Sequence, residues 1–208
     1  MKFQDQKKIQ AGSSKLINKE AFDKDNYMIE NMHLNAAYIF YLDKNNINDK
    51  SLKNKVLQEF KKNYSDYRNY WTNVNKNIIE NKITNYLKKP YCIDIEVASI
   101  CDLACPHCYR EYIVTPDKIM KEELFKKIIK QIEELQVPSI KLNWRGEPLL
   151  NPKILEFIDL AKKAGVIEVS INTNATTLDE KKAEKLINSG LDQIIFSFDG
   201  GTKETYEK

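Results

Sequence analysis

The sequence lacks the long apolar runs that would place a protein in a membrane. No stretch of the 208 residues approaches the roughly 18 consecutive apolar residues of a membrane-spanning helix. The first ten residues, MKFQDQKKIQ, are polar where a secretory signal peptide has an apolar stretch. We therefore expect a cytoplasmic protein without a membrane span.

An excess of charge of one sign is also missing. The formal net charge is +3, from 33 Lys and Arg against 30 Asp and Glu. Proteins that bind nucleic acid usually carry a strongly basic face, so we expect no nucleic-acid partner. The apolar fraction of 42% is enough to build a core in a chain of this length. The composition therefore predicts a globular protein.

Glycine is nearly absent from the first 89 residues, where Gly12 stands alone. Apolar and aromatic residues recur there at helical spacing, namely Leu52, Val56, Leu57, Phe60, Tyr64, Tyr67, Tyr70 and Trp71. This spacing predicts a mainly helical N-terminal appendage over residues 1–89. We expect its aromatic stripe to pack on the neighbouring domain; a cofactor or substrate surface is the alternative.

From Pro90 onward, short β-rich runs alternate with amphipathic helical runs. The expected strands are residues 91–98, 139–144, 167–172 and 193–198, and the expected helices are 122–135, a helix after Asn151, one from about Asp179, and one from Thr202. This alternation predicts an α/β domain over residues 90–208 with a parallel sheet, wound as an open sheet or curled toward a barrel. In both cases the active site lies at the carboxyl ends of the strands.

Cysteine is scarce, yet three of the four cysteines, Cys101, Cys105 and Cys108, fall within eight positions. Cytosolic thiols stay reduced, so such a cluster is expected to bind metal. Structural zinc needs four ligands, usually in two pairs. Cys92 or His107 could complete a zinc site, although Cys92 is expected to be a small buried residue. An iron-sulfur cluster with one iron left open fits three thiolates better. A zinc module is the alternative.

The cysteine motif, with the ring-bearing His107 directly before its third cysteine, resembles the signature of radical S-adenosylmethionine (radical SAM) enzymes. The resemblance continues through GEPLL (146–150), INTNAT (171–176) and FSFDGGTKETYEK (196–208), and so covers about residues 91–208. The later motifs are most similar to radical SAM proteins that carry a C-terminal SPASM-type extension. No such extension is present in these 208 residues.

This resemblance implies a partial (β/α) barrel, of which the chain supplies about four of the usual six strand-helix units before ending. It implies a 4Fe-4S cluster and S-adenosylmethionine as cofactors. The cluster would cleave S-adenosylmethionine reductively, and the 5′-deoxyadenosyl radical would abstract hydrogen from a peptide, protein or sugar-related substrate. A flavodoxin or ferredoxin would donate the electron. Because an uncovered fourth strand exposes backbone groups, a non-catalytic fragment is the alternative.

The resemblance also assigns roles to individual residues at the strand ends. Cys101, Cys105 and Cys108 would bind the cluster. Gly146 and Glu147 would receive the methionine ammonium, and His107 would pack near the adenine. The methionine carboxylate or the ribose would contact Asn172, Ser197 and Asp199. Each strand-end residue also has a structural alternative as a turn or loop former, and Arg145 stands where the family commonly has glycine.

Overall fold

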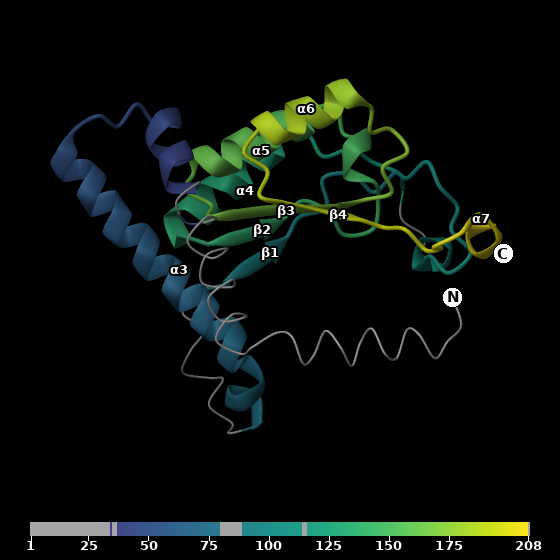
Figure 1. The fold of residues 1–208 in the computed structure, drawn as a ribbon, viewed down its shortest axis with the longest axis horizontal. Helices are drawn as coiled ribbons and strands as arrows, with labels where there is room; N and C mark the ends of the chain where they lie inside the picture. The colour runs from purple at the N-terminus through teal and green to yellow at the C-terminus, as the bar shows by residue number, and fades with distance from the viewer. Residues whose placement is uncertain (1–33, 35–36, 80–88, 114–115, 208) are drawn as a thin grey trace.

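Four parallel strands form one sheet in a computed structural model that describes residues 34, 37–79, 89–113 and 116–207 (Figure 1). The strands are β1 (Cys92–Asp94), β2 (Ser139–Lys141), β3 (Glu168–Thr173) and β4 (Gln193–Phe196). Each strand pairs with the next one in the chain. A sheet wound in one direction is typical of a barrel, whereas an open doubly wound sheet reverses its strand order. The predicted partial α/β barrel is confirmed.

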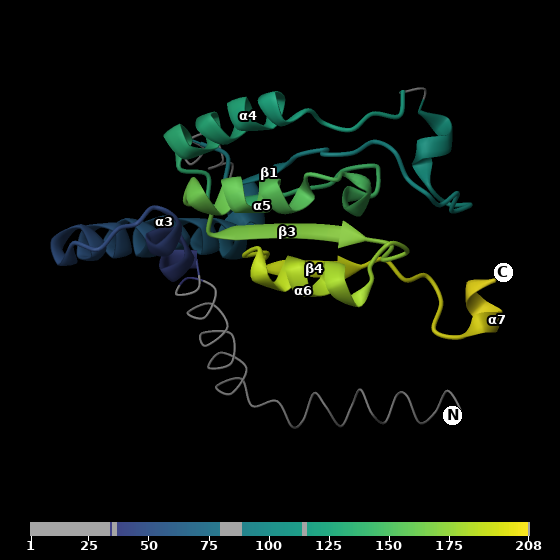
Figure 2. The same cartoon turned by 90° about the horizontal axis from the view of Figure 1, so that it is seen from above.

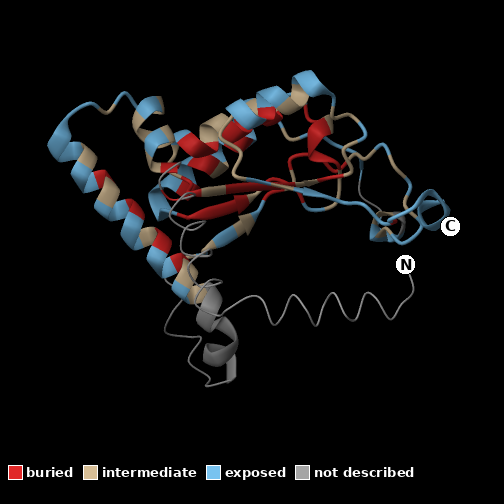
Figure 3. Cartoon of the chain, in the orientation of Figure 1, coloured by how far each residue is buried: buried red, intermediate tan, exposed pale blue. Residues whose placement is uncertain are grey.

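Three helices cover one face of this sheet: α4 (Glu122–Leu135), α5 (Ile154–Lys163) and α6 (Glu180–Asn188) (Figures 1 and 2). Alternate strand residues point toward them, and Ile140, Val169 and Ile171 are fully buried there. The rings of Phe125 and Phe157 stack 3.9 Å apart between α4 and α5. Figure 3 shows the buried residues concentrated in the central strands and in these helices.

The opposite face of the sheet, which would face the barrel interior, is polar. The strand register places on it Cys92, Asp94, Ser139, Lys141, Glu168, Ser170, Asn172, Gln193 and Ile195. The Ser139 hydroxyl lies 3.6 Å from the Cys92 sulfur and 3.3 Å from a Glu168 carboxylate oxygen, so its one hydrogen can bond to either neighbour across this face. Its polarity suits a water-filled or ligand-filled interior better than a packed apolar one.

Helix α3 (Lys50–Ile79) crosses the amino ends of the strands, at the end of the molecule opposite the cysteine loop (Figure 1). Val56, Phe60, Tyr64 and Tyr67 are buried beside Ile167, so the predicted packing of the aromatic stripe is confirmed for these four. The Tyr67 hydroxyl also donates to Glu168 at 3.1 Å. Leu52 is 44% exposed and so is not part of the contact. The side chain of Trp71 lies outside the described residues.

No helix within the described part of the chain has both the length and the apolar content that a membrane span requires. The 30-residue helix α3 carries charged residues along its whole length.

The first strand is shorter than predicted because its second half pairs outside the sheet. The Ile95 amide still donates to Lys141 at 2.8 Å, but Ala98 forms an antiparallel bridge with Ile119. The Met120 amide donates to Val97 at 2.9 Å. These contacts pair the chain that leaves β1 with the chain that enters α4, and the described residues between the two, 99–113 and 116–117, belong to the loop that connects them.

The segments that follow the carboxyl ends of β1 and β2, called their exits below, are in backbone contact at Gly146. A methyl group added to Gly146 would lie 2.2 Å from the Ala98 carbonyl oxygen and 2.6 Å from that of Ile100. The next amide, that of Glu147, donates to Ile100 at 2.8 Å. The contact therefore requires a residue without a side chain.

The helices α4, α5 and α6 each end next to a residue in the left-handed backbone conformation, which for α6 is Gly190 with φ 89°. Gln136 closes α4 with φ 51°, and Gly165 follows α5 with φ 85°. Glycine adopts this conformation without steric cost, whereas other residues lose about 1–2 kcal/mol.

We expect Gln136→Gly to raise the free energy of unfolding by up to about 1 kcal/mol, because it removes a left-handed non-glycine residue. Gly165→Ala should lower it by about 1 kcal/mol for the opposite reason. Urea denaturation of the two variants and the wild type measures both effects. Shifts of the same sign in the two variants would contradict this account.

Gly146→Ala should lower the free energy of unfolding by about 1–3 kcal/mol, because the added methyl group overlaps backbone atoms that cannot rotate away. Gly201→Ala is the matched control, since nothing lies within 4 Å of the methyl group it adds. Thermal unfolding followed by circular dichroism measures both. Equal melting temperatures for the two variants would refute the close contact.

Candidate functional site

The three clustered cysteines lie on the loop between β1 and α4, at the carboxyl ends of the strands (Figure 1). The base of this loop is held by Ser99. Its amide donates to Lys118 at 2.8 Å, and its hydroxyl donates to Pro116 at 3.1 Å. Arg110 pairs with Asp117 at 2.9 Å across the loop. The loop is thus tied at both ends, which limits where its cysteines can lie.

The cysteines themselves form a donor set suited to a multi-iron cluster. Cys101, Cys105 and Cys108 are free and partly exposed, and the Cys108 amide donates to Cys105 at 2.9 Å. Burial raises the pKa of the Cys105 thiol, and the nearby charges of Asp199, Cys108 and Cys101 raise it further. Three thiolates here would repel one another, and bound iron would relieve that repulsion.

A single zinc ion fits this loop less well. Zinc holds thiolates at about 2.3 Å in a tetrahedron, which brings their sulfurs to within about 4 Å of one another. Among the described residues, no three His, Cys, Asp or Glu side chains are grouped closely enough to bind one metal ion. Cys92 is exposed at the amino end of β1, so the expectation that it is buried is wrong. At that end of the strand it also lies away from the cysteine loop.

Glu147 joins the exits of β2 and β3. It is buried, with 3% of its surface exposed, and it caps the short 3-10 helix η3 (Pro148–Leu150) by accepting from the Leu149 amide at 2.9 Å. Its other donors come from the end of β3: the Thr173 hydroxyl at 2.7 Å and the Asn174 amide at 2.8 Å. This carboxylate thus fixes the geometry of the strand ends beside the cysteine loop.

The polar face continues to the end of β3 at Asn172. The Asn172 amide donates to the Asn143 side chain at 2.8 Å. Its own side-chain oxygen is buried and, within the described residues, accepts no hydrogen bond. An unfilled acceptor at a strand end fits a ligand that brings a hydroxyl or ammonium donor, as S-adenosylmethionine does.

The next loop residues reach across to the cysteine loop. The Asn174 side chain donates to Asp102 at 2.9 Å and approaches the Cys101 sulfur at 3.7 Å. The Thr176 hydroxyl also donates to Asp102. This hydrogen bond and the one from Asn174 lower the pKa of the Asp102 carboxyl, so it is charged at neutral pH.

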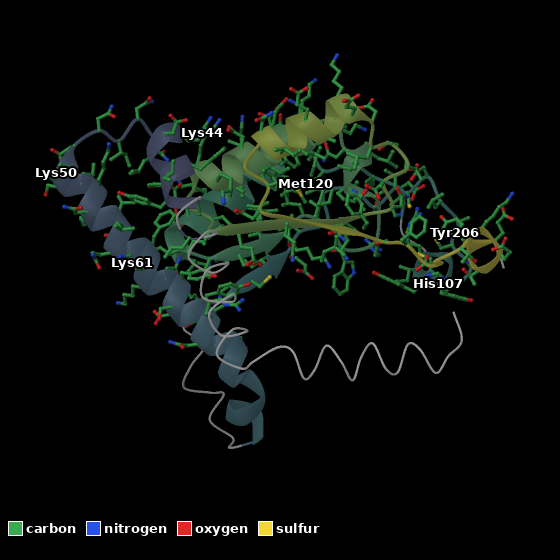
Figure 4. All side chains as sticks on the ribbon, viewed as in Figure 1. Lys44, Lys50, Lys61, His107, Met120 and Tyr206 are labelled. Carbon is green, nitrogen blue, oxygen red and sulfur yellow. The ribbon has the colours of Figure 1, made fainter. Side chains whose placement is uncertain are left out.

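His107 and Asp199 meet where the cysteine loop and the exit of β4 come together. Their nearest side-chain atoms are 3.5 Å apart, and both side chains are more than half exposed. The Ser197 amide donates to Thr173 at 2.8 Å, which aligns the exits of β3 and β4. Figure 4 shows His107 at this end of the molecule near Tyr206, with Lys50 and Lys61 of α3 at the other end. The structure therefore brings His107 and Asp199 to the cysteine loop.

Glu96 and Asp102 were missed by the sequence analysis. Glu96 accepts two hydrogen bonds from the Arg145 guanidinium, at 2.7 and 2.5 Å, and this pairing raises the pKa of Arg145. Asp102 and its partners are 72 and 74 residues apart. No local pattern marks such distant pairs, although INTNAT had singled out the segment that contains Asn174 and Thr176.

Similar proteins cover this part of the chain. A probable GTP 3′,8-cyclase of Methanothermobacter marburgensis is 32% identical over 122 residues, which are 59% of this chain and 39% of that protein. A tungsten-containing aldehyde ferredoxin oxidoreductase cofactor-modifying protein of Pyrococcus furiosus is 29% identical over 106 residues, 50% of this chain and 30% of that one. The chain thus spans about two fifths or less of these relatives.

Among solved structures, Streptococcus suis SuiB bound to S-adenosylmethionine superposes with a TM-score of 0.50 at 21% identity. The match covers 78% of this chain and 34% of SuiB, and it shows a shared fold. The sequence profile of the Radical SAM superfamily matches residues 95–208, more than half of the chain. The chain belongs to the radical SAM superfamily, whose members use a 4Fe-4S cluster and S-adenosylmethionine.

Proposed function

We propose that residues 95–208 form the core of an enzyme that cleaves S-adenosylmethionine reductively and abstracts hydrogen from a substrate. The observation that carries this proposal is the loop with Cys101, Cys105 and Cys108, whose free thiols meet the polar exits of the other strands. Three thiolates leave one iron of a four-iron cluster open for a ligand. The family profile over the same residues supports this reading.

Within this proposal the three cysteines hold the cluster. When bound, the cluster supplies the electron that breaks a carbon-sulfur bond of S-adenosylmethionine and so yields a 5′-deoxyadenosyl radical. A small redox protein such as a flavodoxin or ferredoxin is the proposed electron donor. The chain's own residues orient the ligand and keep the strand ends in place.

The proposed S-adenosylmethionine contacts lie along the strand exits. Gly146 and Glu147 would take the methionine ammonium; Glu147 already accepts three hydrogen bonds, so it also holds the turn after β2 against the end of β3. The unfilled oxygen of Asn172 offers an acceptor for a hydroxyl or ammonium. His107 would lie by the adenine. The remaining proposed contacts to the carboxylate or ribose are Ser197 and Asp199.

The substrate is proposed to be a polar molecule bound over the polar face of the sheet, on which Asp94, Lys141 and Glu168 lie. The sequence had favoured a peptide, protein or sugar-related substrate. The names of the relatives point instead to GTP for the cyclases, and to a cofactor for the modifying protein. GTP is therefore the first substrate to test, with peptides and sugars as the comparison.

After anaerobic reconstitution and reduction, the wild type should show the electron paramagnetic resonance signal of a 4Fe-4S cluster, and S-adenosylmethionine should shift it by binding the open iron. Cys101→Ala should lose the cluster. Cys92→Ala is the matched control and should keep it, because Cys92 lies at the other end of β1. About one tightly held zinc and no iron in the wild type would favour the zinc module instead.

Glu147→Ala should weaken S-adenosylmethionine binding about tenfold or more, because it removes a buried charged acceptor. Thr173→Val is its control: it cuts one hydrogen bond to Glu147 but keeps the carboxylate. Titrating the ligand-induced shift in the resonance signal gives both affinities. Equal losses in the two variants would mean that Glu147 acts only by holding β3 in place.

A further inference from the structure

Two polar side chains, those of Asn174 and Asp102, lie next to the Cys101 sulfur. Their role, as inferred below, rests on the proposed function. Asn174 points its side-chain nitrogen at the Cys101 sulfur, 3.7 Å away. One oxygen of Asp102 lies 3.9 Å from the same sulfur. We propose that Asn174 and Asp102 are positioning residues that set the reduction potential of the cluster through Cys101, in opposite directions.

The orientation of the Asn174 amide is fixed by its neighbours. The Thr176 backbone amide, which can only donate, lies 3.1 Å from the Asn174 side-chain oxygen. The Asp102 carboxylate, which can only accept when charged, lies 2.9 Å from the Asn174 side-chain nitrogen. Exchanging the two ends of the amide would break both contacts. The nitrogen therefore faces Asp102 with one hydrogen, which leaves the other for the sulfur.

The backbone of Asn174 is held as firmly as its side chain. Its amide donates to the buried carboxylate of Glu147 at 2.8 Å. The following residue, Ala175, has φ 60° and donates to the Thr173 hydroxyl at 3.0 Å. A non-glycine residue takes this conformation only where its surroundings impose it. The donor to Cys101 is thus attached to a rigid turn.

The effect on the potential follows from charge. Reduction brings one electron from an external reductant into the cluster, and no bond breaks in the protein. The added negative charge spreads onto the thiolate sulfurs, where a hydrogen-bond donor stabilises it and a carboxylate destabilises it. Asn174 should therefore raise the potential, and Asp102 should lower it. The two residues also hold each other, which keeps both beside the sulfur.

The test is a redox titration of the reconstituted cluster, followed by electron paramagnetic resonance without S-adenosylmethionine. Asn174→Ala should make the potential more negative and Asp102→Asn more positive. We expect each to change the ratio of reduced to oxidised cluster at a fixed potential about tenfold, which is about 59 mV for one electron. The Asp102→Asn variant keeps an oxygen for Asn174 and loses the charge.

Thr177→Val is the control from the same loop. Its buried hydroxyl has no hydrogen-bond partner within the described residues, so its loss should leave the potential unchanged. A purely structural role would shift both test variants in the same direction, or lower their iron content without an opposite pair of shifts. Either result overturns the proposal, as does an unchanged potential in both.

If Asn174→Ala binds no cluster, Asp102→Asn decides alone: a more positive potential supports the proposal, and an unchanged one refutes it. If both variants bind less than half of the wild-type iron, the residues are structural and the proposal fails. A wild type that assembles no 4Fe-4S cluster would instead refute the proposed function. The two failures are therefore distinguishable.

Discussion

The hydrogen bonds of the buried Glu147 carboxylate determine how the strand exits are arranged. Each of its oxygens takes a donor from the end of β3, and one of them also caps the turn after β2. Burying a carboxylate is costly unless its oxygens are satisfied, so this position tolerates little rearrangement. Because the backbone of Gly146 packs directly against the segment that follows β1, the ends of three strands are fixed relative to one another.

The site therefore depends on contacts between residues that are far apart in the sequence. The helices and strands that carry those residues follow instead from local sequence patterns. The helix expected over residues 122–135 is found at Glu122–Leu135, because its apolar spacing matches a helical face that the sheet buries. The strands expected over 167–172 and 193–198 are found at Glu168–Thr173 and Gln193–Phe196. Local spacing was sufficient for α4 and β3, whose apolar residues fall on the face that packs against neighbouring elements. The strand β4 was located from its run of strand-forming residues, most of which are exposed.

Features that depend on distant partners were harder to predict. The strand expected over 91–98 ends at Asp94, since the chain beyond it pairs with residues near 119 rather than with β2 alone. The cysteines and Glu147 could be chosen from their motifs, because the residue types themselves limit the chemistry. Asp102 and Glu96 could not, because their roles come from partners that only folding brings near. The motifs contained some of those partners, but nothing in the sequence indicated which residues they would contact.

The position of α3 affects how a ligand can approach the polar face of the sheet. The Tyr67 hydroxyl on this helix donates a hydrogen bond to Glu168 on the polar face of the sheet. The helix therefore covers the amino ends of the strands. A ligand bound over the polar face would therefore have α3 at the amino ends of the strands and the cysteine loop at their carboxyl ends. In the proposed enzyme, the substrate and the electron donor would both have to reach the cysteine end of the sheet, so the space beside that loop would have to serve both.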